Sequence, residues 1–397
     1  MENILKFAEE NKDKSFLELP FCIVDSLILS QISYLDYGGS SFEKIYFDKK
    51  ICEYYHKKAN NYSDIVIKGM QTAEDDQKLI AILAGGGRHG GLRACRYVEE
   101  FCCESEKQFA AITFELGNHE YYIAFRGTDT SVVGWKEDFA LSFQHEIPAQ
   151  KAALEYVQET MLSFPGKFYI GGHSKGGNLA VYAAMNLPEA IQKRINAVYS
   201  FDGPGFLSEV YEKSNYENIH HIVCKVIPKS SIIGMILEEY ADYRVIKSDA
   251  ELYWQHNPYT WEVRENDFVY LDSEDLFSRL VKRSLDGLLE ELTFEERRKI
   301  VDTVFQVIED AGITSFYGFT EQRFEKIRSI MDQVACVEIQ EKRFVYQALK
   351  RLFSIATEEL RQKAREEGAA QVEKSAILLE KRLLQIEKIL QSIQRGE

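Results

Sequence analysis

The sequence predicts an α/β fold, in which a mostly parallel sheet carries helices on both faces and is followed by an all-helical C-terminal extension. Between residues 109 and 228, short apolar runs typical of strands alternate with longer segments of helical period. The first two strand-like runs are separated by Gly-Asn-His, a turn that indicates an antiparallel hairpin. From about Leu276 onward the strand-like runs stop. This alternation favours a parallel sheet with the hairpin at its start.

Each expected element follows from its own run of residues. Residues 17–37 open with an apolar segment that is expected to be helical after Pro20, and residues 42–84 are mostly helical in pattern. The hairpin strands are FAAITFEL at 109–116 and EYYIAFRG at 120–127. The remaining expected elements are a helix over 149–162, a strand over 167–172, a helix over 178–194, and strands over 195–203 and 219–228.

The change in pattern predicts two domains, with the sheet in residues 1–275 and a helical extension in residues 276–397. In the last expected helix, apolar residues are spaced alternately four and three apart, which is the heptad pattern of a coiled coil. The seam consists of Val372, Ala376, Leu379, Leu383, Ile386, Leu390 and Ile393. Periodicity alone does not distinguish a helix packed on its own domain from a contact with a second chain. A homo-oligomer through this helix is therefore one of two expectations.

Composition excludes several classes of partner. The chain has 397 residues, of which 45% are hydrophobic and 28% charged, as in soluble globular proteins. The formal net charge of −15 argues against nucleic acid or an anionic membrane as partner of the main body, which holds all of the excess negative charge. No window approaches the roughly 18 apolar residues of a membrane-spanning helix, and the first 14 residues lack the apolar segment of a signal peptide. The seven cysteines are scattered apart from Cys102 and Cys103, which predicts reduced thiols and a cytoplasmic location.

Residues 169–184, YIGGHSKGGNLAVYAA, carry the strongest chemical signal. Gly172, Ser174 and Gly176 fit the pattern G-x-S-x-G, with a strand expected before the serine and a helix after it. A serine in a strained turn between strand and helix requires close backbone approach, so glycines two residues away on either side are expected. The first N–H groups of the helix point into the same space. We interpret the turn as a nucleophile elbow; the alternative is a tight structural turn.

A second motif precedes the elbow. The run AFRGT at residues 124–128 is followed by W-x-x-D at Trp135 and Asp138. Together with the elbow, these motifs resemble the class 3 (fungal-type) lipases among the α/β-hydrolases, and more closely the bacterial Mbeg-like proteins, a lipase-related family of unassigned function. The resemblance covers about residues 17–270 and implies an α/β-hydrolase fold that cleaves an ester. It further implies that the backbone N–H groups of Thr128 and Lys175 form the oxyanion hole, with Trp135 and Asp138 supporting the loop.

The base is expected to follow the serine and the acid in the chain. His256, in YWQHNPYTW, has the required place in this order, in a polar loop bounded by Pro258. His220 and His221 are the alternatives, but they precede a strand whose other end faces the catalytic side of the sheet.

The expected acid departs from the lipase pattern. Class 3 lipases carry an Asp in a D-I-V-P segment, and the matching segment here, IPKSSIIGMIL, has Ser231 at that place. Asp202, in AVYSFDGPGF, ends the strand that follows the elbow helix, one strand earlier than the usual position of the acid. We expect Asp202 to take the place of the missing acid. Its alternative role is a turn-forming Asp before Gly-Pro. Glu238 and Asp242 are weaker candidates.

Two further patterns carry no function. Residues 85–90 satisfy G-x-G-x-x-G, but the run before them is helical rather than strand-like. His220, His221 and Cys224 would point to opposite faces of a strand, so no metal site is expected. The sequence thus predicts a serine hydrolase without cofactor that acts on a small acyl-ester or lipid-like substrate through Ser174, His256 and Asp202. The alternative is a weak or inactive hydrolase-like scaffold whose helical tail binds a partner protein.

Overall fold

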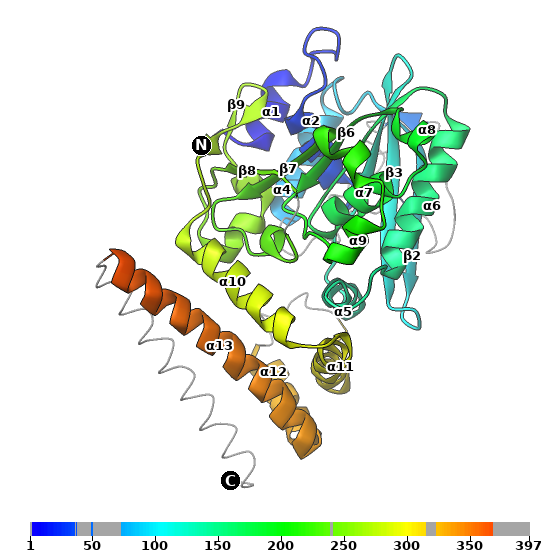
Figure 1. Ribbon diagram of the computed structural model, residues 1–397. Coiled ribbons are helices and arrows are strands. Elements are labelled where there is room, and N and C mark those ends of the chain that lie inside the picture. The colour runs from blue at the N-terminus through cyan, green and yellow to red at the C-terminus, as the bar shows by residue number, and fades with distance from the viewer. Residues whose placement is uncertain are drawn as a thin grey trace. The chain divides into compact units, whose positions relative to one another are not determined.

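The computed structural model describes residues 2–35, 37, 49–50, 73–238, 241–314 and 323–367 (Figure 1). The chain divides into two compact units. The first comprises Met1–Leu141 and His145–Glu274, and the second comprises Ser142–Gln144 and Asp275–Glu397.

One nine-stranded sheet organises the described part of the first unit, in the order β1-β2-β3-β4-β5-β6-β7-β8-β11. Strands β4 to β8 pair in parallel, and the strands outside them pair antiparallel. The strands are β1 (Lys49–Lys50), β2 (Arg93–Cys102), β3 (Lys107–Gly117), β4 (Glu120–Phe125), β5 (Lys167–His173), β6 (Ile195–Phe201), β7 (Val223–Pro228), β8 (Tyr243–Ile246) and β11 (Tyr270–Leu271). A separate two-stranded sheet joins β9 (Val263–Arg264) to β10 (Asp267–Phe268).

Helices cover both faces of this sheet. Helices α6 and α7 pack on each other; α6 also contacts β3, and α7 contacts β4, β5 and β6 (Figure 1). Helix α5 contacts β3. Helix α2 packs on β4, β5 and β6, and α1 and α4 contact α2 and each other. Because β4 to β8 follow chain order and parallel crossovers are right-handed, the intervening helices share one face. The helices are α1 (Ile4–Asn11), α2 (Ile23–Ile32), α4 (Ala73–Ala84), α5 (Val132–Ala140), α6 (Pro148–Ser163), α7 (Lys175–Met185), α8 (Glu189–Gln192) and α9 (Ser208–Glu212). The predicted α/β-hydrolase fold class is confirmed.

The expected hairpin is present, with β3 and β4 joined at a tight turn. Asn118 and His119 both have positive φ, 50° and 58°, as the central residues of the favoured two-residue hairpin turn require. Strand β2, in contrast, has no counterpart among the expected strands. Its charges obscure the strand pattern, yet Arg96 is buried and donates to Thr160 Oγ1 at 2.8 Å, while Glu99 accepts from Arg126 at 2.7 Å.

The described helices of the second unit are α10 (Leu276–Glu291), α11 (Phe294–Asp310), α12 (Arg323–Cys336) and α13 (Ile339–Glu367). Helix α10 lies along α13, and α11 contacts α12 and α13 (Figure 1). A Cβ on Gly287 would lie 3.3 Å from Ile355 Cδ1, so the glycine permits a close approach of α10 to α13. The predicted heptad seam at residues 372–393 lies outside the described residues.

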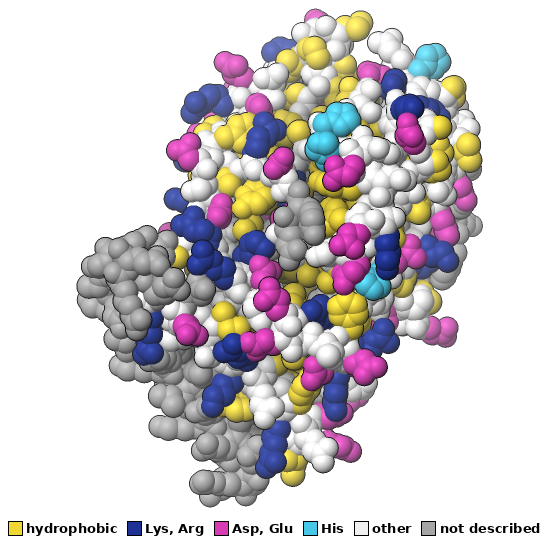
Figure 2. All heavy atoms as spheres, viewed as in Figure 1, with side chains coloured by type: hydrophobic (Ala, Val, Ile, Leu, Met, Phe, Trp, Pro, Cys, Tyr) yellow, Lys and Arg dark blue, Asp and Glu magenta, His cyan; other side chains and the backbone are white. Residues whose placement is uncertain are grey.

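The surface carries charges of both signs. On the face drawn in Figure 2, acidic and basic side chains are interspersed with apolar ones. Among the described helices, none is long and apolar enough to span a membrane.

Candidate active site

Ser174 stands between the end of β5 and the start of α7 in a strained conformation, with φ 58° and ψ −131°. The flanking glycines make this turn possible. A Cβ on Gly172 would lie 2.3 Å from the carbonyl carbon of Gly176, and one on Gly176 would lie 2.3 Å from Phe125 O. A non-glycine residue at either position would thus displace the backbone. Strain of this kind, held by the surroundings, is typical of functional turns.

Asp202 and His256 form a close pair. Asp202 follows β6 with φ 50°, and its Oδ2 lies 2.6 Å from His256 Nδ1. The other oxygen, Oδ1, accepts hydrogen bonds from Ser231 Oγ at 2.5 Å and from Gly234 N at 3.2 Å. The Asp202 side chain is fully buried, whereas the His256 ring is 20% exposed.

The surroundings favour an ionised Asp202. Burial raises the pKa of a carboxyl group, but here the hydrogen bond and charge of His256 and the hydrogen bond from Ser231 outweigh burial and lower the pKa of Asp202. A carboxylate at Nδ1 holds the proton on that nitrogen of His256. The lone pair of Nε2 is then available to accept a proton.

His173, the residue before Ser174, packs against His256 with ring centroids 4.5 Å apart and the ring planes tilted by 34°. Its Nε2 lies 2.9 Å from His256 O, and its Nδ1 lies 3.3 Å from the Tyr34 hydroxyl. Burial, reinforced by the charge of His256, lowers the pKa of His173 to about 3, so this ring is neutral at physiological pH. These contacts bring the His256 segment against the elbow. Within the described residues, no hydrogen bond joins Ser174 Oγ to His256; such bonds often tighten only when substrate is bound.

The loop after β4 lies directly on the elbow. A Cβ on Gly127 would lie 2.6 Å from His173 O and 3.2 Å from Ser174 Cβ. Among the described residues, neither the Thr128 N–H nor the Lys175 N–H donates a hydrogen bond. One of these N–H groups belongs to the residue after the serine and the other to the loop that packs on the elbow, and an N–H group without a partner can donate to an anion.

Asp138 braces the same loop from α5. The Thr128 hydroxyl donates a hydrogen bond to Asp138 Oδ2, and Lys175 Nζ lies 3.8 Å from Asp138 Oδ1. Burial raises the pKa of Asp138 to about 6, although Lys175 and the hydrogen bond from Thr128 act in the opposite direction. Trp135 lies half-buried on α5, one turn before Asp138.

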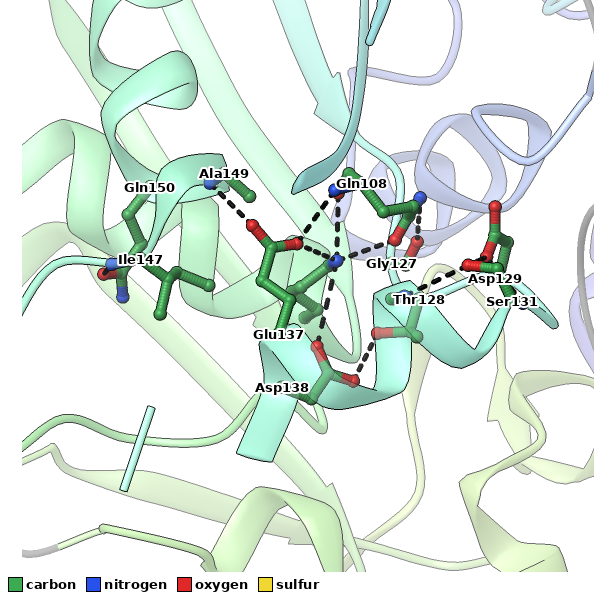
Figure 3. A network of polar contacts seen from close by, with 12 residues as sticks. Gln108, Gly127, Thr128, Asp129, Ser131, Glu137, Asp138, Ile147, Ala149 and Gln150 are labelled. Carbon is green, nitrogen blue, oxygen red and sulfur yellow. Dashed lines mark hydrogen bonds and ion pairs between the residues drawn. The ribbon is translucent and has the colours of Figure 1, made fainter. Parts of the chain in front are cut away.

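A buried polar network lies behind the loop (Figure 3). Lys175 Nζ donates to Gln108 O at 2.9 Å, to Gln108 Oε1 at 2.7 Å and to Glu137 Oε2 at 2.8 Å. Gln108 of β3 and Glu137 of α5 stand in no motif or spacing that predicts a functional role. The available signal was the lysine next to the serine, since a buried lysine requires acceptors from other elements.

The other candidate residues lie apart from His256. Glu238 is buried and paired with Lys225, and Asp242 is exposed. His220 and His221 lie exposed at the amino end of β7, whereas Ser174 and Asp202 follow the carboxyl ends of parallel strands. In the described part of the chain, no group of three or more His, Cys, Asp or Glu side chains is arranged to hold a metal ion.

Comparison with known proteins identifies the family. The Mbeg1-like family model matches residues 84–306, which is more than half of the chain. The chain belongs to the Mbeg1-like family. The matched region of this Mbeg1-like protein includes Ser174, Asp202 and His256, and the predicted family resemblance is confirmed. A crystal structure of M37 lipase is similar over 81% of this chain and 97% of that chain, with 14% sequence identity and a TM-score of 0.33. No curated protein matches the chain.

Proposed function

We propose that this Mbeg1-like protein is a serine hydrolase that cleaves carboxylic esters, with Ser174 as nucleophile, His256 as base and Asp202 as acid. The observation that supports the proposal most is the 2.6 Å contact between Asp202 and His256, because the His256 ring also packs against His173, the residue before Ser174. A strained serine, a partly exposed imidazole and a buried carboxylate are the parts that acyl transfer requires.

The mechanism follows from these positions. Ser174 Oγ attacks the ester carbonyl carbon while His256 Nε2 takes the hydroxyl proton, and the ionised Asp202 stabilises the resulting imidazolium. The N–H groups of Thr128 and Lys175 hold the oxyanion. The tetrahedral intermediate expels the alcohol, which receives the proton from His256. Water, activated by the same imidazole, then hydrolyses the acyl-enzyme. No cofactor takes part in these steps.

The proposed substrate has an apolar portion. Leu252 and Trp254, in the same 3₁₀ turn as His256, are 50% and 59% exposed. Large apolar side chains beside the base suit an acyl or lipid-like ester rather than a strongly polar one.

The experiment is labelling with a fluorophosphonate probe, combined with hydrolysis of short p-nitrophenyl esters. We expect the wild type to be labelled and active, and Ser174→Ala to be folded, unlabelled and inactive. Ser163→Ala, at an exposed serine that ends α6, is the matched control and keeps wild-type labelling. A wild type that neither reacts with the probe nor hydrolyses esters would contradict the proposal and favour the inactive scaffold.

A further inference from the structure

The two proposed oxyanion donors are connected behind the site through the Lys175 side chain. This side chain is buried, and its ammonium group has three acceptors within 2.9 Å. Glu137 supplies the compensating charge and is itself satisfied. Its Oε1 accepts from Ala149 N at 2.8 Å, and its Oε2 also accepts from Gln108 N at 3.1 Å. A buried ion pair with all its hydrogen bonds made holds its neighbours in one arrangement.

Lys175 and Glu137 together hold Gln108 through three of its four polar groups. Its backbone N–H is bonded to Glu137, and its backbone O and side-chain Oε1 are bonded to Lys175. Because the ammonium group only donates, the amide oxygen of Gln108 faces Lys175 and the amide nitrogen faces the other way. That nitrogen lies 3.4 Å from Gly127 O, in the loop that carries Thr128 (Figure 3).

The direction of the Gly127 carbonyl decides the direction of the Thr128 N–H. The two groups belong to one trans peptide unit, which is planar, so they point to opposite sides. A carbonyl directed at Gln108 therefore leaves the N–H directed away from it. Ser174 Cβ lies close to Gly127 on the elbow side.

We propose that Gln108 is a positioning residue of the oxyanion hole: oriented by Lys175 and Glu137, it holds the Gly127–Thr128 peptide with its N–H toward Ser174. This inference rests on the proposed function and deepens it. Lys175 accordingly has two roles, since its backbone N–H is one oxyanion donor and its side chain orients the other.

The test is Gln108→Glu, examined by kinetics and by crystallography. The carboxylate has nearly the shape of the amide and can still accept from Lys175, but it cannot donate to Gly127 O. We expect the peptide to turn, with a fall in kcat of about 10²–10³-fold, the usual effect of losing one oxyanion donor. KM should change by only a few-fold, because the lost interaction acts in the transition state.

Two further variants complete the experiment. Gln108→Met removes the donor without adding charge and should give the same loss of kcat, which covers the case in which Gln108→Glu does not fold. The matched control is Gln192→Glu, at a buried glutamine whose Nε2 donates to Ala184 O at 3.0 Å near the far end of α7. It should keep wild-type kcat, even if its thermal stability falls.

The outcomes separate this proposal from the proposed function. Wild-type kcat in both Gln108 variants, or an unmoved Gly127–Thr128 peptide in their crystal structures, overturns the role of Gln108. If the wild type itself hydrolyses no ester, the proposed function fails. The crystal structures of the variants then decide alone whether Gln108 positions the Gly127–Thr128 peptide. A turned peptide then supports the positioning role, and an unmoved one contradicts it.

Discussion

Asp202 and Ser231 meet at one point although they follow different strands. The Ser231 hydroxyl donates to one oxygen of Asp202 at 2.5 Å, and the other oxygen lies against His256. Ser231 also stands where the class 3 lipase pattern has its acid. A carboxylate at either position would therefore lie near the same imidazole.

Asp202→Asn is expected to lower kcat for p-nitrophenyl esters by up to about 10⁴-fold, as the comparable change does in a serine protease, because the amide cannot stabilise the imidazolium. Adding Ser231→Asp in that background should restore part of the rate, since it returns a carboxylate to this point. Steady-state kinetics of the single and double variants measure both effects. A wild-type rate in Asp202→Asn would remove this residue from the triad.

His256→Ala should reduce kcat by about 10³-fold or more, because the members of a triad act as a unit. The control is His221→Ala, since His221 is exposed at the amino end of β7. We expect this variant to keep its activity. The reverse result, with His221→Ala inactive and His256→Ala active, would assign the base to the other histidine.

Asp138 gives stability an unusual dependence on pH. Folding raises its pKa from 3.8 to about 6, so the native state binds this proton more tightly than the unfolded state. Its contribution to the free energy of unfolding is fully present below pH 3.8 and is lost as the pH rises through about 6. Urea denaturation between pH 4 and 8 should show that Asp138→Asn lacks this decline, although Asn can still accept from Thr128. Parallel curves for the two proteins would contradict the shift.

At the scale of elements, a buried ionic cluster joins α2 to the turn after α4. Arg88 donates to both oxygens of Asp25, at 2.8 and 2.6 Å, and His89 Nε2 lies 2.7 Å from the same carboxylate. Arg88 also donates to Leu19 O at 2.9 Å. The glycine-rich run at 85–90, which follows a helix, thus places two side chains inward to hold the N-terminal segment.

Asp25→Asn should lower the free energy of unfolding by about 3–5 kcal/mol, because it leaves the buried Arg88 guanidinium without its counter-charge. Asp75→Asn is the matched control. Within the described part of the chain, Asp75 pairs with Lys78 at the surface, where ion pairs contribute about 1 kcal/mol or less. Urea denaturation compares the two variants, and an equal, small effect in both would show that the cluster is dispensable.

At the scale of the whole molecule, the chain joins a sheet-containing unit to a helical one. Every residue proposed for catalysis belongs to the first unit. The heptad pattern of residues 372–393 suggests a separate role in association.

Deleting residues 368–397 should therefore spare ester hydrolysis and reduce self-association. Sedimentation velocity of the full chain and the truncated chain measures the second effect, and p-nitrophenyl ester turnover measures the first. An unchanged mass would favour a heptad helix that packs on its own chain.

The sequence by itself determined the features that depend on near neighbours in the chain. The fold class, the β3–β4 hairpin and the strained turn at Ser174 follow from alternation, turn residues and the two flanking glycines, because these constraints act within a few residues. The order of serine, acid and base is a further prediction from the sequence.

Only the tertiary structure decided which side chains meet across elements. That Asp202, and not Glu238, lies against His256 depends on how separate strands end at the same edge of the sheet. Strand β2 was missed because its charged residues are paired inside the fold, Arg96 with Thr160 of α6 and Glu99 with Arg126, which follows β4. Gln108, Glu137 and His173 contact segments remote in sequence, and a pairing of that kind leaves no periodic trace along the chain.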